Sequence, residues 1–284
     1  MSKVAIVTDS TAYIPDDLLK KYDITVAPQI VIWGEESFRD GIDIQPDEFY
    51  KRLENSKVMP TTSQVSIVDM KTAFEGLVEQ GFEVLGIFLS AKLSGTMQSA
   101  QQALEMLPKV ADKIAIVDST STAMAMGFHV LAAARAAQAG ETLLECRKLA
   151  EEAQKHTGVL FTVDTLEFLH RGGRIGGAQA LMGTMLNIKP ILELRAGRIE
   201  PVERVRTKSK ATERMLELVI GQIAGRLPLR LATLHANAEA EARALLSMAA
   251  ARLNPIEQIF ASVSPAIGTH AGPGTVGLAF MAGM

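Results

Sequence analysis

The chain has 284 residues, 48% of them hydrophobic and 21% charged, and this ordinary globular balance excludes a mainly disordered protein. Its formal net charge of −3 and the absence of a long basic run argue against a nucleic-acid-binding protein, and its single cysteine excludes an intrachain disulfide or a cysteine-cluster metal site. No stretch approaches the ~20 apolar residues of a spanning helix, and the apolar run Val4–Val7 near the N-terminus is too short for the hydrophobic region of a secretory signal. We therefore expect a cytoplasmic protein without stable membrane insertion.

Strand and helix signals alternate along the first half of the chain. Short apolar runs predict strands at Val4–Thr8, Thr25–Trp33, Glu83–Leu89 and Ile114–Val117. Helix-initiating residues predict helices that begin near Pro15, Pro46, Ser66, Ser94 or Thr96, Thr122 and Thr142. This alternation indicates a parallel sheet with right-handed crossovers, and ligands of such sheets bind at the carboxyl ends of the strands.

The second half has a different pattern, with hairpins among its strands. Strands are predicted at Gly158–Val163, Pro190–Leu194, Arg198–Val205, Arg230–His235, Ile256–Ala261 and Val276–Met281. Helices are predicted at Thr165–Leu169, Ala178–Leu186, Thr207–Ala224 and Ala238–Arg252. We therefore predict an α/β protein of two domains, an N-terminal parallel-sheet α/β domain at 1–156 and a C-terminal α+β domain at 157–284.

Three stretches far apart in the chain are rich in hydroxyls or glycine, namely Thr61–Gln64, Ser94–Thr96 and Gly268–Gly274. Backbone N–H groups and small hydroxyls of this kind can surround an oxyanion. Taken alone, the first stretch is interpreted as a helix cap, and the second suits a cap or an anion site equally well. The third is predicted to be a rigid loop, which is either a surface turn or a loop that brings His270 to a ligand.

The residue types of a hydrolytic triad are also present, as Ser94, His270 and either Asp9 or Asp118. However, Ser94 lacks the Gly-x-Ser-x-Gly context of a nucleophile elbow. The five histidines show no close ligand spacing, so no metal is expected. The residues alone therefore indicate a binding site more than a reaction centre.

These three stretches and several other short motifs follow one another along the chain. They are Thr8-Asp9-Ser10, Thr61-Thr62-Ser63-Gln64, Leu93-Ser94-Gly95-Thr96, Val117-Asp118-Ser119, Thr165–Leu169, Gly172-Gly173-Arg174-Ile175, Leu186–Leu192, Arg206-Thr207-Lys208 and Gly268–Gly274. In this order and spacing they resemble the DegV family, the bacterial fatty-acid-binding family, nearly from end to end. One departure is Val65, which stands where the family usually has proline.

The resemblance implies a protein that buries one long-chain fatty acid in a tunnel between its two domains. The carboxylate-binding hydroxyls of the family match Thr62 and Ser94, with Ser63 and Thr96 as neighbours, and His270 matches the histidine near the head group. No catalytic residue, metal or cofactor is implied beyond the bound fatty acid. Met97, Met182 and Met185 are candidates for the tunnel lining, because methionine adapts to flexible ligands.

The resemblance also implies a partner, the catalytic subunit of a fatty acid kinase, to which the carboxylate is presented for acyl phosphate formation and phospholipid synthesis. Arg174 matches a position associated with kinase docking, and Arg206 is expected to face the head group. Two other functions stay open: an acyl hydrolase or phosphotransferase using Ser94 and His270, and a regulatory module that binds another anion.

Overall fold

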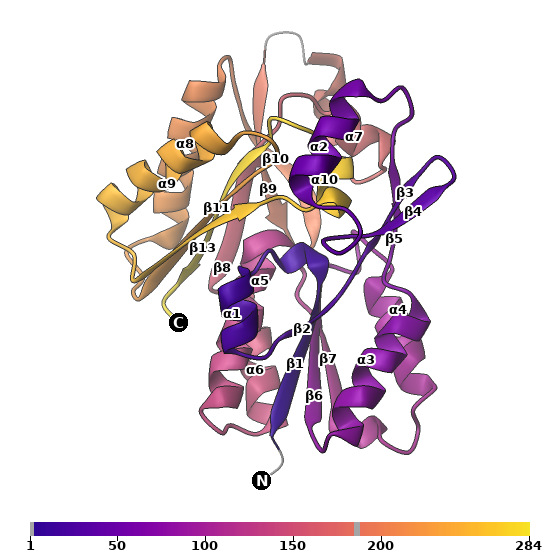
Figure 1. The fold of residues 1–284 in the computed structure, drawn as a ribbon. Coiled ribbons are helices and arrows are strands. Elements are labelled where there is room, and N and C mark those ends of the chain that lie inside the picture. The colour runs from indigo at the N-terminus through magenta and orange to yellow at the C-terminus, as the bar shows by residue number, and fades with distance from the viewer. Residues whose placement is uncertain (1–2, 185–187) are drawn as a thin grey trace.

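The computed structural model describes residues 3–184 and 188–284, in which a four-stranded sheet and a six-stranded sheet pack together with a small three-stranded sheet beside them (Figure 1). The four-stranded sheet is entirely parallel, with the order β2-β1-β6-β7. Its strands are β1 Val4–Asp9, β2 Thr25–Ala27, β6 Glu83–Phe88 and β7 Ile114–Asp118. All six residues of β1 are buried, as expected for a parallel strand covered on both faces.

Helices cover both faces of this parallel sheet. On one face lie α3 Ile67–Glu79 and α4 Thr96–Glu105, and on the other lie α5 Ala123–Gln138 and α6 Leu143–Ala153. Because Val7 packs with the first pair and Ile6 with the second, alternate residues of β1 serve two separate cores. The carboxyl ends of the strands point toward the six-stranded sheet (Figure 1).

The six-stranded sheet has the order β10-β9-β8-β13-β11-β12, and its neighbours are antiparallel except for the parallel pair β11 and β12. Its strands are β8 Thr157–Thr162, β9 Lys189–Arg195, β10 Arg198–Val205, β11 Leu229–His235, β12 Glu257–Ser262 and β13 Val276–Ala282. Helices α8 Lys208–Ile223 and α9 Glu239–Leu253 cover one face. The other face turns toward α5 and the parallel sheet.

Helix α5 joins the two large sheets, because it contacts β1 and β6 on one side and β8, β11 and β13 on the other. Twelve of its 16 residues are buried, and most of these are alanine, methionine or other apolar residues. A helix that is apolar all round is typical of a position inside a protein, and its alanines allow close approach. The predicted division at 156/157 falls between α6 and β8, and the assignment of two domains stays a prediction.

The three-stranded sheet β4-β3-β5 is antiparallel and comes from the N-terminal half, yet it lies beside the C-terminal helix α10 Pro265–Ala271. Its strands are β3 Ile30–Trp33, β4 Glu36–Arg39 and β5 Thr61–Ser63. The backbone N–H of Ala266, in the first turn of α10, donates to buried Asp40 (3.1 Å), so a side chain of the first half holds a helix of the second. The remaining elements are α1 Asp16–Lys21, α2 Pro46–Asn55, α7 Glu167–Arg171 and the 3-10 helices η1 Ser10–Ala12, η2 Ala111–Lys113 and η3 Gly176–Thr184.

The predicted class, a parallel-sheet α/β part followed by a part with a more antiparallel sheet, is confirmed. Thr25–Trp33, however, is not one strand: it divides at Pro28 into β2 and β3, which belong to different sheets. Proline lacks an N–H and cannot continue a ladder, which explains the break. The helix predicted at Ala178–Leu186 is a 3-10 helix as far as Thr184, and its last two residues lie outside the described residues.

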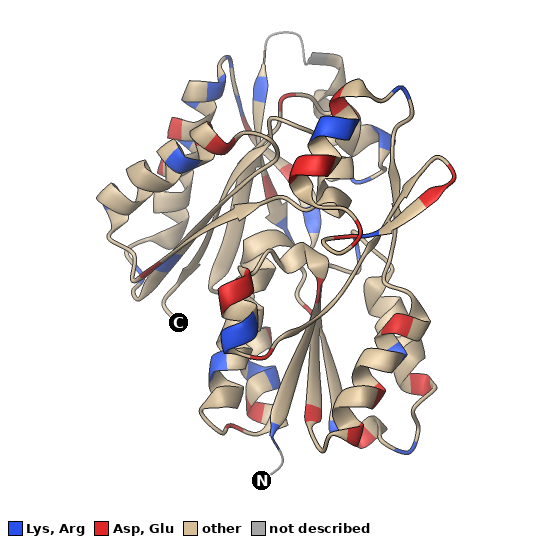
Figure 2. Ribbon diagram, viewed as in Figure 1, with Lys and Arg blue, Asp and Glu red and all other residues tan. Residues whose placement is uncertain are grey.

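Charged residues of both signs are interspersed on the outer helices, and few lie on the central strands (Figure 2). This distribution agrees with the small net charge. None of the helices in the described residues is long and apolar enough to cross a bilayer.

Candidate functional site

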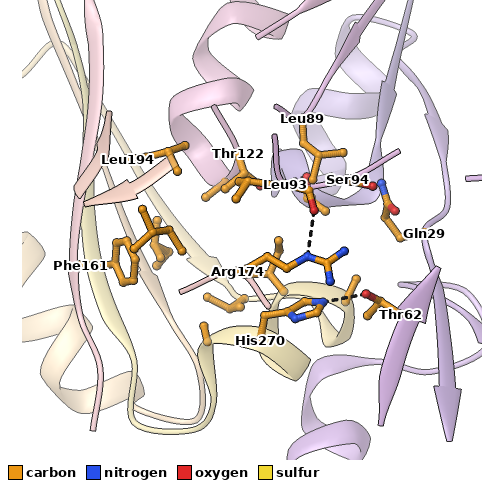
Figure 3. A pocket seen from close by; sticks show the side chains of 18 of the residues that line it. Gln29, Thr62, Leu89, Leu93, Ser94, Thr122, Phe161, Arg174, Leu194 and His270 are labelled. Carbon is orange, nitrogen blue, oxygen red and sulfur yellow. Dashed lines mark hydrogen bonds between the residues drawn. The ribbon is translucent and has the colours of Figure 1, made fainter. Parts of the chain in front are cut away.

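A largely apolar cavity lies between the carboxyl edge of the parallel sheet and the six-stranded sheet (Figure 3). Its apolar wall comes from both halves of the chain: Leu89, Leu93, Val159, Phe161, Leu169, Leu194, Ile199, Leu234, Val263, Ala266 and Ile267. A cluster of polar side chains lies at one end, namely Gln29, Thr62, Ser94, Arg174 and His270. The other polar residues of the wall are Thr11, Tyr13, Gln64, Thr122 and Thr275. Such a cavity fits a ligand with one polar head and a long apolar body.

Thr62 and His270 meet at the polar end, although 208 residues separate them in the chain. The Thr62 hydroxyl and His270 Nε2 are 2.7 Å apart. Pairing of β5 with β3 fixes Thr62, and because strand residues alternate, Thr62 is half-buried while Thr61 and Ser63 are exposed.

His270 lies in the last turn of α10, against the end of α7. A Cβ on Gly172 would come within 2.0 Å of His270 Nδ1, so only glycine lets the chain approach the ring this closely. Nδ1 is buried and has no hydrogen-bond partner among the described residues, so contact with Thr62 holds the ring through its other nitrogen.

Ser94 follows β6 and lies at the same end of the cavity, in a turn that leads into α4. Its hydroxyl lies 3.0 Å from the Thr96 hydroxyl and accepts from the Thr96 backbone N–H (3.3 Å). Gln29 Nε2 donates to the same Thr96 hydroxyl (2.8 Å). Ser94 therefore belongs to a side-chain network that also includes Gln29, a residue between β2 and β3.

Arg174 supplies the positive charge of this end. Its Nε donates to the carbonyl of Leu93 (3.0 Å) and its Nη1 to the carbonyl of Gly172 (2.5 Å), so the guanidinium is held across the two halves of the chain. A fixed guanidinium with N–H groups that no described residue occupies can attract and hold an anion.

The imidazole of His270 is neutral in this setting, because burial, and to a smaller extent the charge of Arg174, lowers its pKa to about 4. We expect NMR titration of the His270 ring to show a midpoint near pH 4 and no change between pH 6 and 8. As the pH falls below 6.5, the unfolded chain takes up this proton before the folded one. The free energy of unfolding should therefore fall between pH 6.5 and 4, by up to about 3 kcal/mol.

The variant His270→Gln keeps a partner for Thr62 and is expected to reduce this acid sensitivity. Part of the sensitivity should remain, because burial lowers the pKa of His129 to about 3. An unchanged pH dependence in His270→Gln, measured by denaturant unfolding at several pH values, would contradict the assignment.

A sequence profile described as "Uncharacterised protein, DegV family" matches residues 3–283 of the chain. The chain belongs to the DegV family. It is 36% identical to the protein DegV of Bacillus subtilis over 276 residues, which cover 97% of this chain and 98% of the relative. It is 39% identical to a DegV domain-containing protein of Streptomyces coelicolor over 277 residues, 97% of each chain.

Solved DegV-family structures share the whole fold. One, from Thermus thermophilus and described as showing fatty acid binding, has a TM-score of 0.93 at 35% identity and covers 99% of both chains. Another, DegV from Bacillus subtilis, described as a fatty acid binding protein, has a TM-score of 0.90 at 35% identity and covers 99% of this chain and all of that one.

This DegV-family structure brings Thr62, Ser94, Arg174 and His270 to one end of the cavity, and their role in binding a carboxylate stays a prediction. Thr96 does not line the cavity but contacts Ser94.

Two predicted head-group residues do not reach the cavity. Ser63 is exposed, because strand alternation turns it away from the face that carries Thr62. Arg206 is exposed just before α8 and is not part of the cavity wall. Neither residue borders the cavity, and the head-group contacts expected of them stay predictions that its geometry does not support.

The predicted methionine lining also needs correction. Met97 is buried in the core between α3, α4 and the parallel sheet, and Met182 is partly exposed in η3. Neither belongs to the cavity wall. Met185 lies outside the described residues.

The hydroxyl- and glycine-rich stretches also differ from their predicted local structures. Thr61–Ser63 is strand β5, and Ser66 caps the following helix as predicted. Neither Ser94 nor Thr96 caps α4, whose N-cap is Gly95. The predicted loop at Gly268–Gly274 is the end of α10 followed by a short turn, because Pro265 starts a helix that the glycine signals did not indicate.

The possible triad is not assembled. In the described residues no hydrogen bond joins Ser94 to His270: Ser94 contacts Thr96, and His270 contacts Thr62. Asp9 accepts from Thr11 and from the Leu89 N–H. Within the described parts of the chain, no three His, Cys, Asp or Glu side chains come together in a way that could hold a metal ion.

Gln29 was not among the predicted site residues. It was hidden inside a run interpreted as one strand, although the preceding Pro28 signals a break at this point. A polar residue placed directly after that break is the signal that could have identified it.

Proposed function

We propose that this protein binds one long-chain fatty acid, with the acyl chain in the apolar cavity and the carboxylate at the end formed by Thr62, Ser94, Arg174 and His270. The observation that carries the proposal is a largely apolar cavity with a connected polar, positively charged cluster at one end. Fatty acid binding described for DegV-family structures with the same fold supports it.

The energetics suit a division of labour between tail and head group. Burying about fifteen methylenes contributes roughly 12 kcal/mol at ~0.8 kcal/mol each, before the costs of association. A hydrogen bond to a charged group contributes about 1.5–3 kcal/mol. The tail therefore dominates affinity, while the hydroxyls and Arg174 fix which end faces the polar side and prevent a buried, unpaired carboxylate.

In this proposal the protein is a non-catalytic carrier, and a fatty acid kinase converts the presented carboxylate to an acyl phosphate for phospholipid synthesis. Arg174 serves the head group and the docking of that kinase. Its guanidinium is half-buried at the polar end, so it is within reach of both the carboxylate and an approaching partner.

Mass spectrometry of the ligand released on denaturation tests the proposal. We expect about one fatty acid per chain, and a nucleotide or sugar phosphate would contradict it. The variant Ser94→Ala is expected to retain most of the lipid, because the tail contacts remain, but to lose acyl phosphate formation by a purified fatty acid kinase about tenfold or more. Equal losses of lipid and of phosphorylation would contradict the division between tail and head group.

A further inference from the structure

The hydroxyl of Ser94 is the last member of a chain of three side chains. Gln29 Nε2 lies 2.8 Å from Thr96 Oγ1, and Thr96 Oγ1 lies 3.0 Å from Ser94 Oγ. Thr96 is fully buried and Gln29 is 3% exposed, so water has little access to the first two members. Only Ser94 and Gln29 border the cavity.

The chemistry of the members favours one direction for these hydrogen bonds. An amide nitrogen donates and does not accept, so Thr96 Oγ1 is the acceptor of the Gln29 contact. A hydroxyl has one proton, and within the described residues the Ser94 oxygen is the acceptor available to the Thr96 proton. Ser94 Oγ also accepts from the Thr96 backbone N–H. Its own proton is then free to point into the cavity.

The surroundings of Gln29 fix which way its amide faces. The backbone N–H of Gln29 donates to Ser10 (3.1 Å), and its carbonyl accepts from the N–H of Asp40 (2.8 Å), so the residue is held on both sides. Burial raises the pKa of the Asp9 carboxyl, and the side chain of Gln29 is among the hydrogen-bond donors that oppose this rise. A donor to Asp9 must be the NH₂ group of Gln29, and the second proton of that group is then available to Thr96.

We propose that Gln29 determines head-group specificity: by donating to Thr96 it makes Ser94 a hydrogen-bond donor, and the site then prefers an ionised carboxylate, which only accepts, to a head group that also carries a proton to donate, such as an alcohol. The inference rests on the proposed fatty acid function. Gln29 is in this respect a positioning residue, because it acts through Thr96 to orient the Ser94 hydroxyl.

The substitution Gln29→Glu reverses the chain at nearly constant shape. The introduced carboxyl lies beside Asp9, where like charge favours uptake of a proton. If the carboxyl at position 29 takes up a proton, it donates that proton to Asp9. The other carboxyl oxygen, which faces Thr96, is therefore a hydrogen-bond acceptor whether the group is protonated or ionised. Thr96 must then donate to position 29 and Ser94 must donate to Thr96, which leaves the cavity facing an acceptor.

The test compares the affinities for dodecanoate and dodecan-1-ol at pH 8, by isothermal titration calorimetry on lipid-free protein. Gln29→Glu should weaken dodecanoate about 10- to 100-fold and change dodecan-1-ol less than about threefold. Gln29→Met removes the donor, so the Thr96 hydroxyl can either donate to Ser94 or accept from it. This variant should weaken dodecanoate binding less than Gln29→Glu does and leave the affinity for dodecan-1-ol unchanged. This second variant keeps the inference testable if Gln29→Glu does not fold.

Gln98→Glu is the matched control for charge. Gln98 lies on α4, two residues after Thr96, but it is exposed and does not border the cavity, so its carboxylate is screened by water and should change both affinities less than about threefold. A loss equal to that of Gln29→Glu would overturn the inference, as would parallel losses of acid and alcohol in the Gln29 variants. Failure of the unaltered protein to bind dodecanoate would instead overturn the proposed function, and the inference with it.

Discussion

Replacing Gly272 by alanine is expected to destabilise the protein by about 4 kcal/mol and to lower its thermal midpoint by roughly 10 °C. Gly272 has φ 76° and ψ 163°, a region of backbone conformation that is accessible essentially to glycine alone. In addition, a Cβ at this position would lie 2.3 Å from a ring carbon of Phe168. Strain and overlap therefore act together at the turn between α10 and β13, and denaturant or thermal unfolding measures their sum.

Gly225→Ala is the matched control, because Gly225 has nearly the same φ (73°) but nothing within 4 Å of the added carbon. It should cost about 1 kcal/mol, which is the cost of a side chain at positive φ alone. Because α10 carries His270, Gly272→Ala is also expected to displace the Thr62–His270 contact and so alter the titration of the ring. Equal stability losses in the two variants would show that the contact with Phe168 is unimportant.

The alternation of apolar runs with capped helices was sufficient to predict most elements of the fold. Helix α5 is an example: its continuous apolar composition indicates a buried helix, although the pattern does not say that two sheets share it. Thr25–Trp33 shows the limit. Its apolar composition suits one strand, and only Pro28, together with pairing partners far away in the chain, decides that it divides between two sheets.

The site was predictable to the extent that its residues belong to local motifs. Thr62, Ser94 and His270 each occur in a recognisable stretch, and the resemblance to the DegV family predicted that the three form one site. The position of Ser63 depends on strand alternation in β5, which was interpreted as a helix cap, so its outward orientation was missed. The Gln29–Thr96 contact spans 67 residues and depends on how β2, β3 and α4 pack, which no local pattern specifies.

Replacing Leu194 by tryptophan is expected to weaken binding of hexadecanoate about 100-fold while leaving decanoate within about threefold. Leu194, on β9, and Phe161, on β8, border the cavity at the end away from Ser94 (Figure 3). In the proposed orientation this end receives the terminal part of the acyl chain. An indole ring there would exclude about four methylenes at ~0.8 kcal/mol each, or roughly 3 kcal/mol, without touching the head group.

Arg195→Trp provides the control, because Arg195 is the next residue of the same strand, its side chain is 66% exposed, and alternation turns it away from the cavity. It should leave both affinities unchanged, so a general effect of tryptophan on β9 can be separated from the loss of cavity length. If Leu194→Trp weakened both acids alike, the acyl chain would have to run in another direction. Preferential loss of the longer acid is the result that only a tail lying between Phe161 and Leu194 explains, because the two acids share the same head group and differ only in the methylenes that reach this end.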